Sequence, residues 1–318
     1  MLVNPMEIAT SVPVRQTRKQ KKAFRDAVQA YASGLGYAVA LEKGSFGCYN
    51  VVIGDPVHAK YLITAHYDTC ARLPFPNLIT PCNLLPFLLY QLFLVLVIFA
   101  AAFIPGVALG MLLNQPGLGG LLAYILVWGI LALMLVGPAN RHNANDNTSG
   151  VVAVLETART MPAIHRHKVC FVLFDLEEAG LIGSASYRKA HKRETDRQIV
   201  LNMDCIGDGD EIVFFPTGKF RKNGQYLSWL RRGCGTFGKK RISLRDKGFS
   251  YYPSDQTQFP FGVGIAAFHR SKWAGLYCSR IHTPKDTILE ETNVNILRAC
   301  LTSLISNDAV EEERKSYL

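Results

Sequence analysis

The stretch Lys60-Tyr61-Leu62-Ile63-Thr64-Ala65-His66-Tyr67-Asp68 decides how the rest of the chain is interpreted. Its first six residues form a short, mostly apolar run, which predicts a buried β-strand. The run ends on His66 and Asp68, which are separated by one residue. Alternate side chains of an extended backbone face the same side, so His66 can bind a metal while Asp68 orients its ring.

Four later segments repeat this pattern of ligand-type side chains at the end of a hydrophobic segment. They are Asp146-Asn147-Thr148-Ser149-Gly150, Asp175-Leu176-Glu177-Glu178, Asn202-Met203-Asp204 and His282-Thr283-Pro284. Imidazole and carboxylate groups suit zinc, and a carboxylate can bridge two ions. Together the segments predict a hydrolase with two adjacent divalent metals.

Each segment taken alone has a simpler structural explanation. Asp146 precedes a small-residue turn into a helix, where an aspartate is more often an N-cap than a ligand. Asp204 fits a turn, and His282 lies in a polar loop where a free surface histidine is the default. Glu177 and Glu178 are more specific, because one carboxylate can bind metal while the other acts as a general base, although a solvated acidic turn is the alternative. All of these ligand-type residues nevertheless occur together at the ends of hydrophobic segments, which favours the metal centre.

Alternating strands and helices indicate an α/β fold. Strands are predicted at residues 37–42, 50–54, 60–65, 167–174, 198–203 and 262–268, helices at 19–34 and 151–161, and a loop with a helix at 178–191. This order predicts a three-layer α/β/α sandwich around a mixed, largely parallel sheet. Such folds place their ligands at the carboxyl ends of the strands.

A long uncharged segment interrupts this pattern. Residues 73–140 contain no Asp, Glu, Lys or Arg, although 19% of the chain is charged. Residues 84–104 and 119–136 are almost continuously apolar, and each approaches the roughly 20 residues that a helix needs to cross a bilayer. The proline- and glycine-rich part between them predicts a turn. We predict a transmembrane hairpin inserted into a catalytic domain formed by residues 1–72 and 141–318; an apolar lid or dimer surface is the alternative.

The distribution of basic residues orients this hairpin. The chain has a formal net charge of +10 and an early basic cluster of Arg15, Arg18, Lys19, Lys21, Lys22 and Arg25. Arg72 and Arg141 flank the apolar segment, and basic residues near spans favour the cytoplasmic side. We therefore expect two spans, with the catalytic domain and both termini in the cytoplasm. The cluster predicts a solvated face near anionic lipid, because it lacks the interleaved aromatics of a nucleic-acid surface.

Cysteine spacing and the N-terminal segment add two expectations. The eight cysteines include no short CxxC pair, and several lie in apolar runs, which predicts reduced structural thiols. Residues 1–22 have no continuous apolar core, so no signal peptide is expected. Outside the hairpin, about 250 residues are enough for one α/β domain.

Longer runs around these residues resemble the motifs of the M28 family of zinc aminopeptidases. The runs are Ile63-Thr64-Ala65-His66-Tyr67-Asp68-Thr69, Asp146-Asn147-Thr148-Ser149-Gly150, Phe174-Asp175-Leu176-Glu177-Glu178-Ala179-Gly180-Leu181-Ile182-Gly183-Ser184, Asn202-Met203-Asp204 and His282-Thr283-Pro284-Lys285-Asp286-Thr287. The resemblance spans roughly Phe24 to a C-terminal helix, apart from the apolar segment. It implies a fold of the zinc-peptidase type.

The resemblance also implies roles for individual residues. It implies two zinc ions, or other divalent metals, with His66 and Asp204 on their edges and Asp146 bridging them. Glu178 and His282 would complete the five ligands. Glu177 would be the general base and acid, and Asp68 would hold the imidazole of His66.

The implied reaction is release of N-terminal residues from peptides by metal-activated water, with a glutamate moving the proton. Tyr251 or Tyr252 is our candidate for stabilising the oxyanion. Two features depart from the family. Gln256 stands where many relatives carry His, and typical secreted members lack the hairpin. We expect the hairpin to anchor the active site near the bilayer, close to membrane-associated or hydrophobic peptides.

Three other functional classes share such a scaffold. A glutaminyl-peptide cyclase uses one metal, whereas the turn at residues 146–150 looks like the two-metal version. A carboxypeptidase or deacylase is the nearest enzymatic competitor. A noncatalytic membrane binding module is the remaining alternative, and such a descendant would be expected to lose ligands that are all present in this chain.

Overall fold

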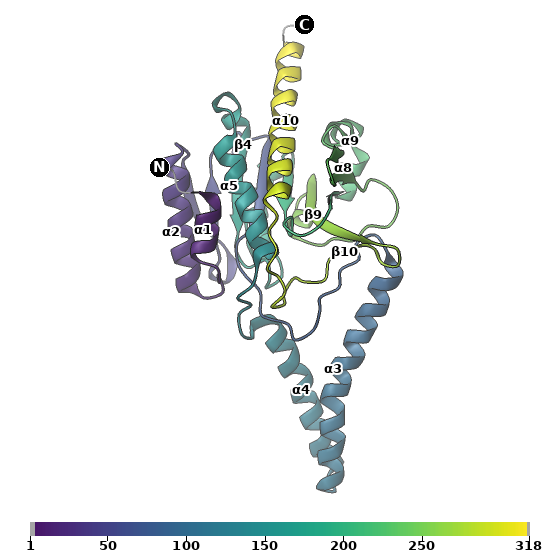
Figure 1. The fold of residues 1–318 in the computed structure, drawn as a ribbon. Coiled ribbons are helices and arrows are strands. Elements are labelled where there is room, and N and C mark those ends of the chain that lie inside the picture. The colour runs from purple at the N-terminus through teal and green to yellow at the C-terminus, as the bar shows by residue number, and fades with distance from the viewer. Residues whose placement is uncertain (1–3, 317–318) are drawn as a thin grey trace.

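The computed structural model describes residues 4–316 of the chain (Figure 1). Its strands are β1 (Val39–Lys43), β2 (Tyr49–Ile53), β3 (Tyr61–His66), β4 (Val169–Phe174), β5 (Ile199–Met203), β6 (Glu211–Pro216), β7 (Gly235–Phe237), β8 (Lys240–Leu244), β9 (Gly262–Ser271) and β10 (Gly275–Tyr277). They form one mixed sheet in the order β1-β2-β4-β3-β5-β9-β6-β8-β7, with β10 paired to β9. The central strands β4, β3, β5 and β9 run parallel.

Helices cover both faces of this sheet. They are α1 (Pro5–Ser11), α2 (Arg18–Gly34), α3 (Leu84–Leu112), α4 (Pro116–Val136), α5 (Gly150–Thr160), α6 (Ile182–Ala190), α7 (Lys192–Thr195), α8 (Gly218–Lys222), α9 (Gly224–Arg231) and α10 (Glu291–Ser316). Side chains of α1, α2, α5 and α10 pack in the larger core on one face, whereas α6 packs in a smaller core on the other. The predicted three-layer sandwich is confirmed.

Alternation along the central strands divides the side chains between the two cores. Ile63 of β3 and Leu173 of β4 join the larger core, whereas their neighbours Leu62 and Val172 join the smaller core with Tyr187 of α6. Successive side chains of a strand point to opposite faces, and both faces here are covered. A sheet covered on both faces therefore explains why β3 and β4 are apolar almost throughout.

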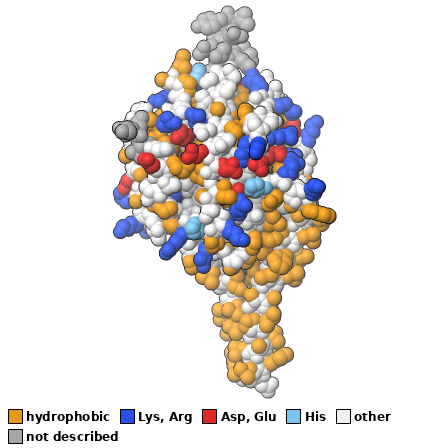
Figure 2. All heavy atoms as spheres, viewed as in Figure 1, with side chains coloured by type: hydrophobic (Ala, Val, Ile, Leu, Met, Phe, Trp, Pro, Cys, Tyr) orange, Lys and Arg blue, Asp and Glu red, His pale blue; other side chains and the backbone are white. Residues whose placement is uncertain are grey.

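The apolar segment forms a helical hairpin, α3 and α4, which projects from the domain on the side opposite to α10 (Figure 1). The buried residues of the two helices are all small: Ala102, Gly106, Gly110, Gly119 and Ala123. A Cβ atom added to Gly106 would lie 2.6 Å from the carbonyl oxygen of Gly119, so the two backbones are in contact. The face of the hairpin seen in Figure 2 is largely apolar, and many large hydrophobic side chains of both helices are exposed.

α3 continues to Leu112, beyond the end predicted at residue 104. Gly106 and Gly110, which suggested a turn, instead contact α4 near Gly119, and Pro105 lies inside α3. Membrane-type helices tolerate an internal proline when neighbouring groups satisfy the freed backbone.

The two ends of this insertion lie side by side at the domain. Ala71 forms an antiparallel bridge with Ala139, and the Arg72 amide donates to the carbonyl oxygen of Pro138 at 2.8 Å. The Asn140 amide donates to the carbonyl oxygen of Cys70 at 3.1 Å. The insertion therefore leaves and re-enters the fold at one place, and it does not separate Asp68 from Asp146 in space.

Part of the early basic cluster lies inside the domain, and for these residues the predicted solvated face is wrong. Arg15 is fully buried, and Lys21 and Arg25 are at most 9% exposed. Arg15 donates to the carbonyl oxygen of Tyr67, and Arg25 donates to the Tyr67 hydroxyl at 2.9 Å. Lys21 pairs with Asp175 at 2.6 Å. A buried cation needs a hydrogen-bond acceptor or a carboxylate as partner. Because Tyr67 and Asp175 lie far away in the sequence, the local basic cluster did not reveal the burial of these three residues.

The other members of the cluster, Arg18, Lys19 and Lys22, are exposed as expected. All eight cysteines lie in the part of the chain that the structure describes, and all are free thiols, as predicted.

Candidate active site

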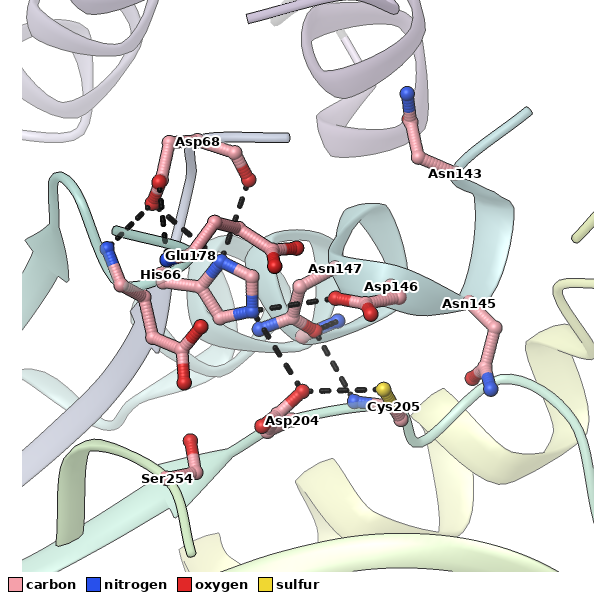
Figure 3. A network of polar contacts seen from close by, with 12 residues as sticks. His66, Asp68, Asn143, Asn145, Asp146, Asn147, Glu178, Asp204, Cys205 and Ser254 are labelled. Carbon is pink, nitrogen blue, oxygen red and sulfur yellow. Dashed lines mark hydrogen bonds and ion pairs between the residues drawn. The ribbon is translucent and has the colours of Figure 1, made fainter. Parts of the chain in front are cut away.

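The five predicted ligands lie together at the carboxyl ends of the central strands. His66 is the last residue of β3, and Asp204 follows β5. Asp146 lies in the turn that precedes α5, Glu178 in the loop after β4, and His282 in the loop that precedes α10. Figure 3 shows four of these side chains, His66, Asp146, Glu178 and Asp204, gathered in one network.

Asp146 lies between the two histidines. Its Oδ1 is 3.3 Å from His66 Nε2, and its Oδ2 is 2.9 Å from His282 Nε2. On the first side Asp204 Oδ1 is 3.6 Å from His66 Nε2. On the second side Glu178 Oε2 is 3.3 Å from His282 Nε2. Two pairs of ligand-type residues therefore share one carboxylate, each pair using a different oxygen of it.

Asp68 connects His66 with the loop after β4 that carries Glu177 and Glu178. Its Oδ1 is 3.5 Å from His66 Nδ1, and its carboxylate accepts hydrogen bonds from the backbone amides of Glu177 at 3.0 Å and Glu178 at 3.3 Å. The hydrogen bond of His66 Nδ1 is to the backbone carbonyl oxygen of Asp68, at 3.2 Å, and the buried carboxylate of Asp68 holds the backbone of both glutamates (Figure 3).

Two supporting residues were not assigned a role from the sequence. The Asp286 carboxylate accepts from the backbone amides of Asn145 at 2.7 Å and Asp146 at 3.0 Å. Arg15 donates to Thr148 Oγ1 at 3.0 Å and so holds the same turn from the N-terminal side. Asp286 could have been noticed as a carboxylate in the His282 motif, whereas Arg15 carried no signal among its basic neighbours.

Burial and crowding shift the pKa values of the site. Burial raises the pKa of Glu177 and of Glu178. Burial opposes ionisation of Asp146 too, but hydrogen bonds and charge from His282 and His66 hold the pKa of Asp146 below its usual value. Burial would lower the pKa of His282, and Glu178 and Asp146 raise it to about 10. The carboxylates here attract positive charge strongly.

The residues fit divalent metal ions. Glu178 Oε1 is buried and has no hydrogen-bond partner, which is costly for a carboxylate oxygen unless a cation binds it. Within the described residues, three groups of ligand atoms lie within 4.8 Å of one another: His66 with Asp146 and Asp204, His66 with Glu177 and Glu178, and Cys70 with Glu178 and His282. Nitrogen and carboxylate donors of this kind suit zinc. The sequence did not suggest Cys70.

The predicted tyrosines line a cavity of about 310 Å³ together with the ligands. The Tyr252 hydroxyl donates to the carbonyl oxygen of Asp204 at 3.2 Å, and burial raises its pKa well above the usual value of 10. Tyr251 is half-exposed and packs edge-on against Phe87 of α3. Gln256, the departure from the family pattern, donates to the carbonyl oxygen of Tyr252 at 2.6 Å and so supports that residue.

Comparison with solved structures supports the fold. A Zn-dependent exopeptidase from Parabacteroides distasonis matches with a TM-score of 0.58 at 14% identity, over 96% of this chain and 99% of that chain. The Legionella pneumophila LapA aminopeptidase matches with a TM-score of 0.57 at 13% identity, over 96% and 71%. A Porphyromonas gingivalis glutaminyl cyclase matches with a TM-score of 0.57 at 14% identity, over 96% and 99%. At these identities the likeness is one of fold alone.

Sequence comparison identifies the family. Aminopeptidase YwaD of Bacillus subtilis (strain 168) is 28% identical over 184 residues, which cover 54% of this chain and 39% of that protein. The match thus spans well under half of that relative. Residues 133–304, more than half of this chain, match the profile of Peptidase family M28. That region contains Asp146, Glu177, Glu178, Asp204 and His282, and the predicted resemblance is confirmed: the chain belongs to peptidase family M28.

Proposed function

We propose that this protein is a membrane-anchored aminopeptidase that uses two zinc ions to release N-terminal residues from peptides. One observation carries the proposal. Asp146 faces His66 with one oxygen and His282 with the other, and both glutamates line the same cavity. Family membership independently supports a metal-dependent hydrolase.

Five residues would hold the metals. His66 and Asp204 would bind one zinc, Glu178 and His282 would bind the other, and Asp146 would bind both. When bound, such ions polarise a scissile carbonyl and lower the pKa of water. Asp68 would keep His66 in one orientation, since its carboxylate lies beside Nδ1 of the ring.

Glu177 is our proposed general base and acid. Its carboxyl would take a proton from the attacking water and deliver it to the leaving amine. The raised pKa of Glu177 favours uptake of a proton, and the Asp68 carboxylate fixes its backbone. Tyr252, whose hydroxyl is held beside Asp204, is the stronger candidate for stabilising the oxyanion, and Tyr251 is the second.

The hairpin supports membrane anchoring. α3 has 29 residues and α4 has 21, or about 43 and 31 Å at 1.5 Å per residue, and a bilayer core is about 30 Å thick. In each helix, only 11% of an apolar stretch of 18 residues is buried. Trp273, which is 91% exposed, lies at the turn between β9 and β10, and its carbonyl oxygen accepts a bond from Asn83, the residue before α3. Tryptophan is enriched at membrane interfaces.

The basic residues suggest the orientation. Arg72 and Arg141 flank the hairpin, and Lys and Arg lie over the globular part of the molecule, some of them next to the apolar surface (Figure 2). We therefore propose two spans, with residues 1–72 and 141–318 forming the cytoplasmic peptidase domain and residues 73–140 the hairpin. The substrate would be a peptide, and the hairpin would contact the lipid bilayer.

Amino-acid analysis of purified protein tests the function. The protein in detergent with zinc is incubated with peptides whose N-terminus is free or acetylated, and with peptides whose C-terminus is free or amidated. We expect amino acids only from free N-termini, whatever the C-terminus. Amino-acid release that requires a free C-terminus or proceeds on acetylated peptides would indicate a carboxypeptidase, and acetate released from acetylated peptides would indicate a deacylase. Ammonia released from N-terminal glutamine without any amino acid would indicate a cyclase.

A further inference from the structure

One wall of the proposed active-site cavity belongs to the hairpin. Phe87 and Gln91 of α3 line the same cavity of about 310 Å³ as His66, Glu177 and Glu178. The upper end of α3 reaches the loops beneath the sheet, close to the turn between β9 and β10 (Figure 1). The hairpin is therefore part of the pocket as well as an extension of the domain.

These two residues share one face of α3. They are four positions apart, which places them one above the other on a helix. Leu88 and Leu89, between them, are 52% and 57% exposed and face elsewhere. Gln91 is the one residue of α3 that has a side-chain amide. An amide facing lipid without a partner is costly, whereas one facing a polar cavity is not.

The lengths of the two helices place the cavity at the surface of the bilayer. Residues 92–112, which follow Gln91 in α3, equal in number the 21 residues of α4. Each stretch is about 31 Å long, which matches a bilayer core of about 30 Å. The first two turns of α3 are then left over, and they are the turns that line the cavity.

The wall around Phe87 is apolar. Phe87 packs edge-on against Tyr251, with ring centroids 5.8 Å apart, and Ile79 and Ile281 line the same cavity. Apart from the proposed ligands and Glu177, every residue of the cavity lining is uncharged. A charged substrate side chain would find no opposite charge on this wall and would lose its hydration.

We infer that α3 recognises the substrate: Phe87 packs against an apolar side chain at its N-terminal residue, and Gln91 hydrogen-bonds its main chain. The enzyme would then select peptides with apolar N-terminal residues at the surface of the bilayer. This inference rests on the proposed function, because it uses the same cavity.

Peptide selectivity of Phe87→Ala tests the inference. Full-length protein in nanodiscs is assayed with Leu-Gly-Gly and Ala-Gly-Gly, next to Leu88→Ala, a truncation of an exposed residue in the same turn that does not line the cavity. We expect the ratio of kcat/KM for leucine over alanine to fall about tenfold in Phe87→Ala, since a lost apolar contact is worth about 1–3 kcal/mol, and to stay within twofold in Leu88→Ala. An unchanged ratio, or an equal loss on both peptides, would overturn the inference.

A binding measurement keeps the inference separate from catalysis. In the Glu177→Gln background, calorimetry with the same two peptides should give a dissociation constant about tenfold weaker for Leu-Gly-Gly when Phe87 is also alanine, and an unchanged one for Ala-Gly-Gly. If the wild type releases no amino acid but the Glu177→Gln proteins show this binding pattern, the proposed activity would be refuted and the role of α3 would be supported. Absence of binding by either peptide in Glu177→Gln would overturn the role of α3.

Gln91→Leu tests the second contact. It keeps the size of the side chain and removes its amide, so KM for both peptides should rise several-fold with little change in kcat. An unchanged KM would remove Gln91 from the proposed recognition.

Discussion

Two neighbouring lysines of α2 form ion pairs of equal length in opposite surroundings. Lys21 Nζ lies 2.6 Å from Asp175, with side chains 8% and 3% exposed. Lys22 Nζ lies 2.6 Å from Asp26, with side chains 70% and 53% exposed. Methionine has a helix propensity similar to that of lysine and a similar length, so Lys21→Met and Lys22→Met differ mainly in the burial of the lost pair.

The two substitutions should differ strongly in stability. Removing one partner of a buried pair costs about 3–5 kcal/mol, because the other charge stays buried. Asp175 keeps hydrogen bonds from the amides of Tyr49 at 3.1 Å and Leu176 at 2.9 Å, so we expect the lower end, about 3 kcal/mol. For a domain of this size that loss lowers Tm by about 6–12 °C. Lys22→Met should cost about 0.5 kcal/mol or less, since exposed pairs in helices contribute little.

Thermal unfolding in detergent, followed by circular dichroism at one zinc concentration, measures both variants. The double variant Lys21→Met with Asp175→Asn removes the buried charge as well and should recover part of the loss. If Lys21→Met were no less stable than Lys22→Met, burial would not govern this pair, and the reasoning that places the basic cluster inside the domain would be refuted.

Three further predictions concern the hairpin, pH and metal. Gly106→Leu should separate α3 from α4 and lower Tm in detergent, because a Cβ atom there meets Gly119 at 2.6 Å, whereas Gly120→Leu, with nothing within 4 Å, should not; equal effects would contradict the packing. The hydrogen bond that the His191 ring donates to the Glu42 carboxylate raises the pKa of His191, so this pair stabilises the fold below about pH 6.5 and the contribution is lost as pH rises through the folded pKa. Urea unfolding should therefore show that Glu42→Gln lowers the free energy of unfolding at pH 6 and hardly changes it at pH 9. A loss of unfolding free energy that grows with pH would contradict this. Zinc at 100 times its Kd should stabilise the protein by about 2.7 kcal/mol, read as a rise in Tm that chelation reverses, and Asp146→Asn should abolish most of that rise.

Strand-end motifs were enough to predict most of the proposed site. The ligand-type residues were predicted because each follows an apolar run, and carboxyl ends of parallel strands meet at one edge of a sheet. That rule brings His66, Glu178 and Asp204 together although they are far apart in sequence, whereas His282 comes from the loop that precedes α10. Alternation and near-continuous apolar runs likewise predicted the central strands within a few residues.

Other features depend on contacts that local sequence does not contain. Lys21 is followed by an exposed lysine, and its partner Asp175 lies 154 positions away, so neighbouring residues gave no sign of its burial. β7 and β10 have three residues each, too few to display a period of two. For Phe87 and Gln91, an apolar run reveals that a helix is long enough for a bilayer, but it does not show which turns lie against the domain.

Zinc content and activity of Glu177→Gln, measured on the same sample, test the central proposal most directly. If Glu177 moves the proton and does not hold metal, the variant should contain about two zinc ions per chain by mass spectrometry, as the wild type does, and release no amino acid from free peptides. Amino-acid release at the wild-type rate, or a loss of zinc together with activity, would contradict the division of roles between Glu177 and Glu178.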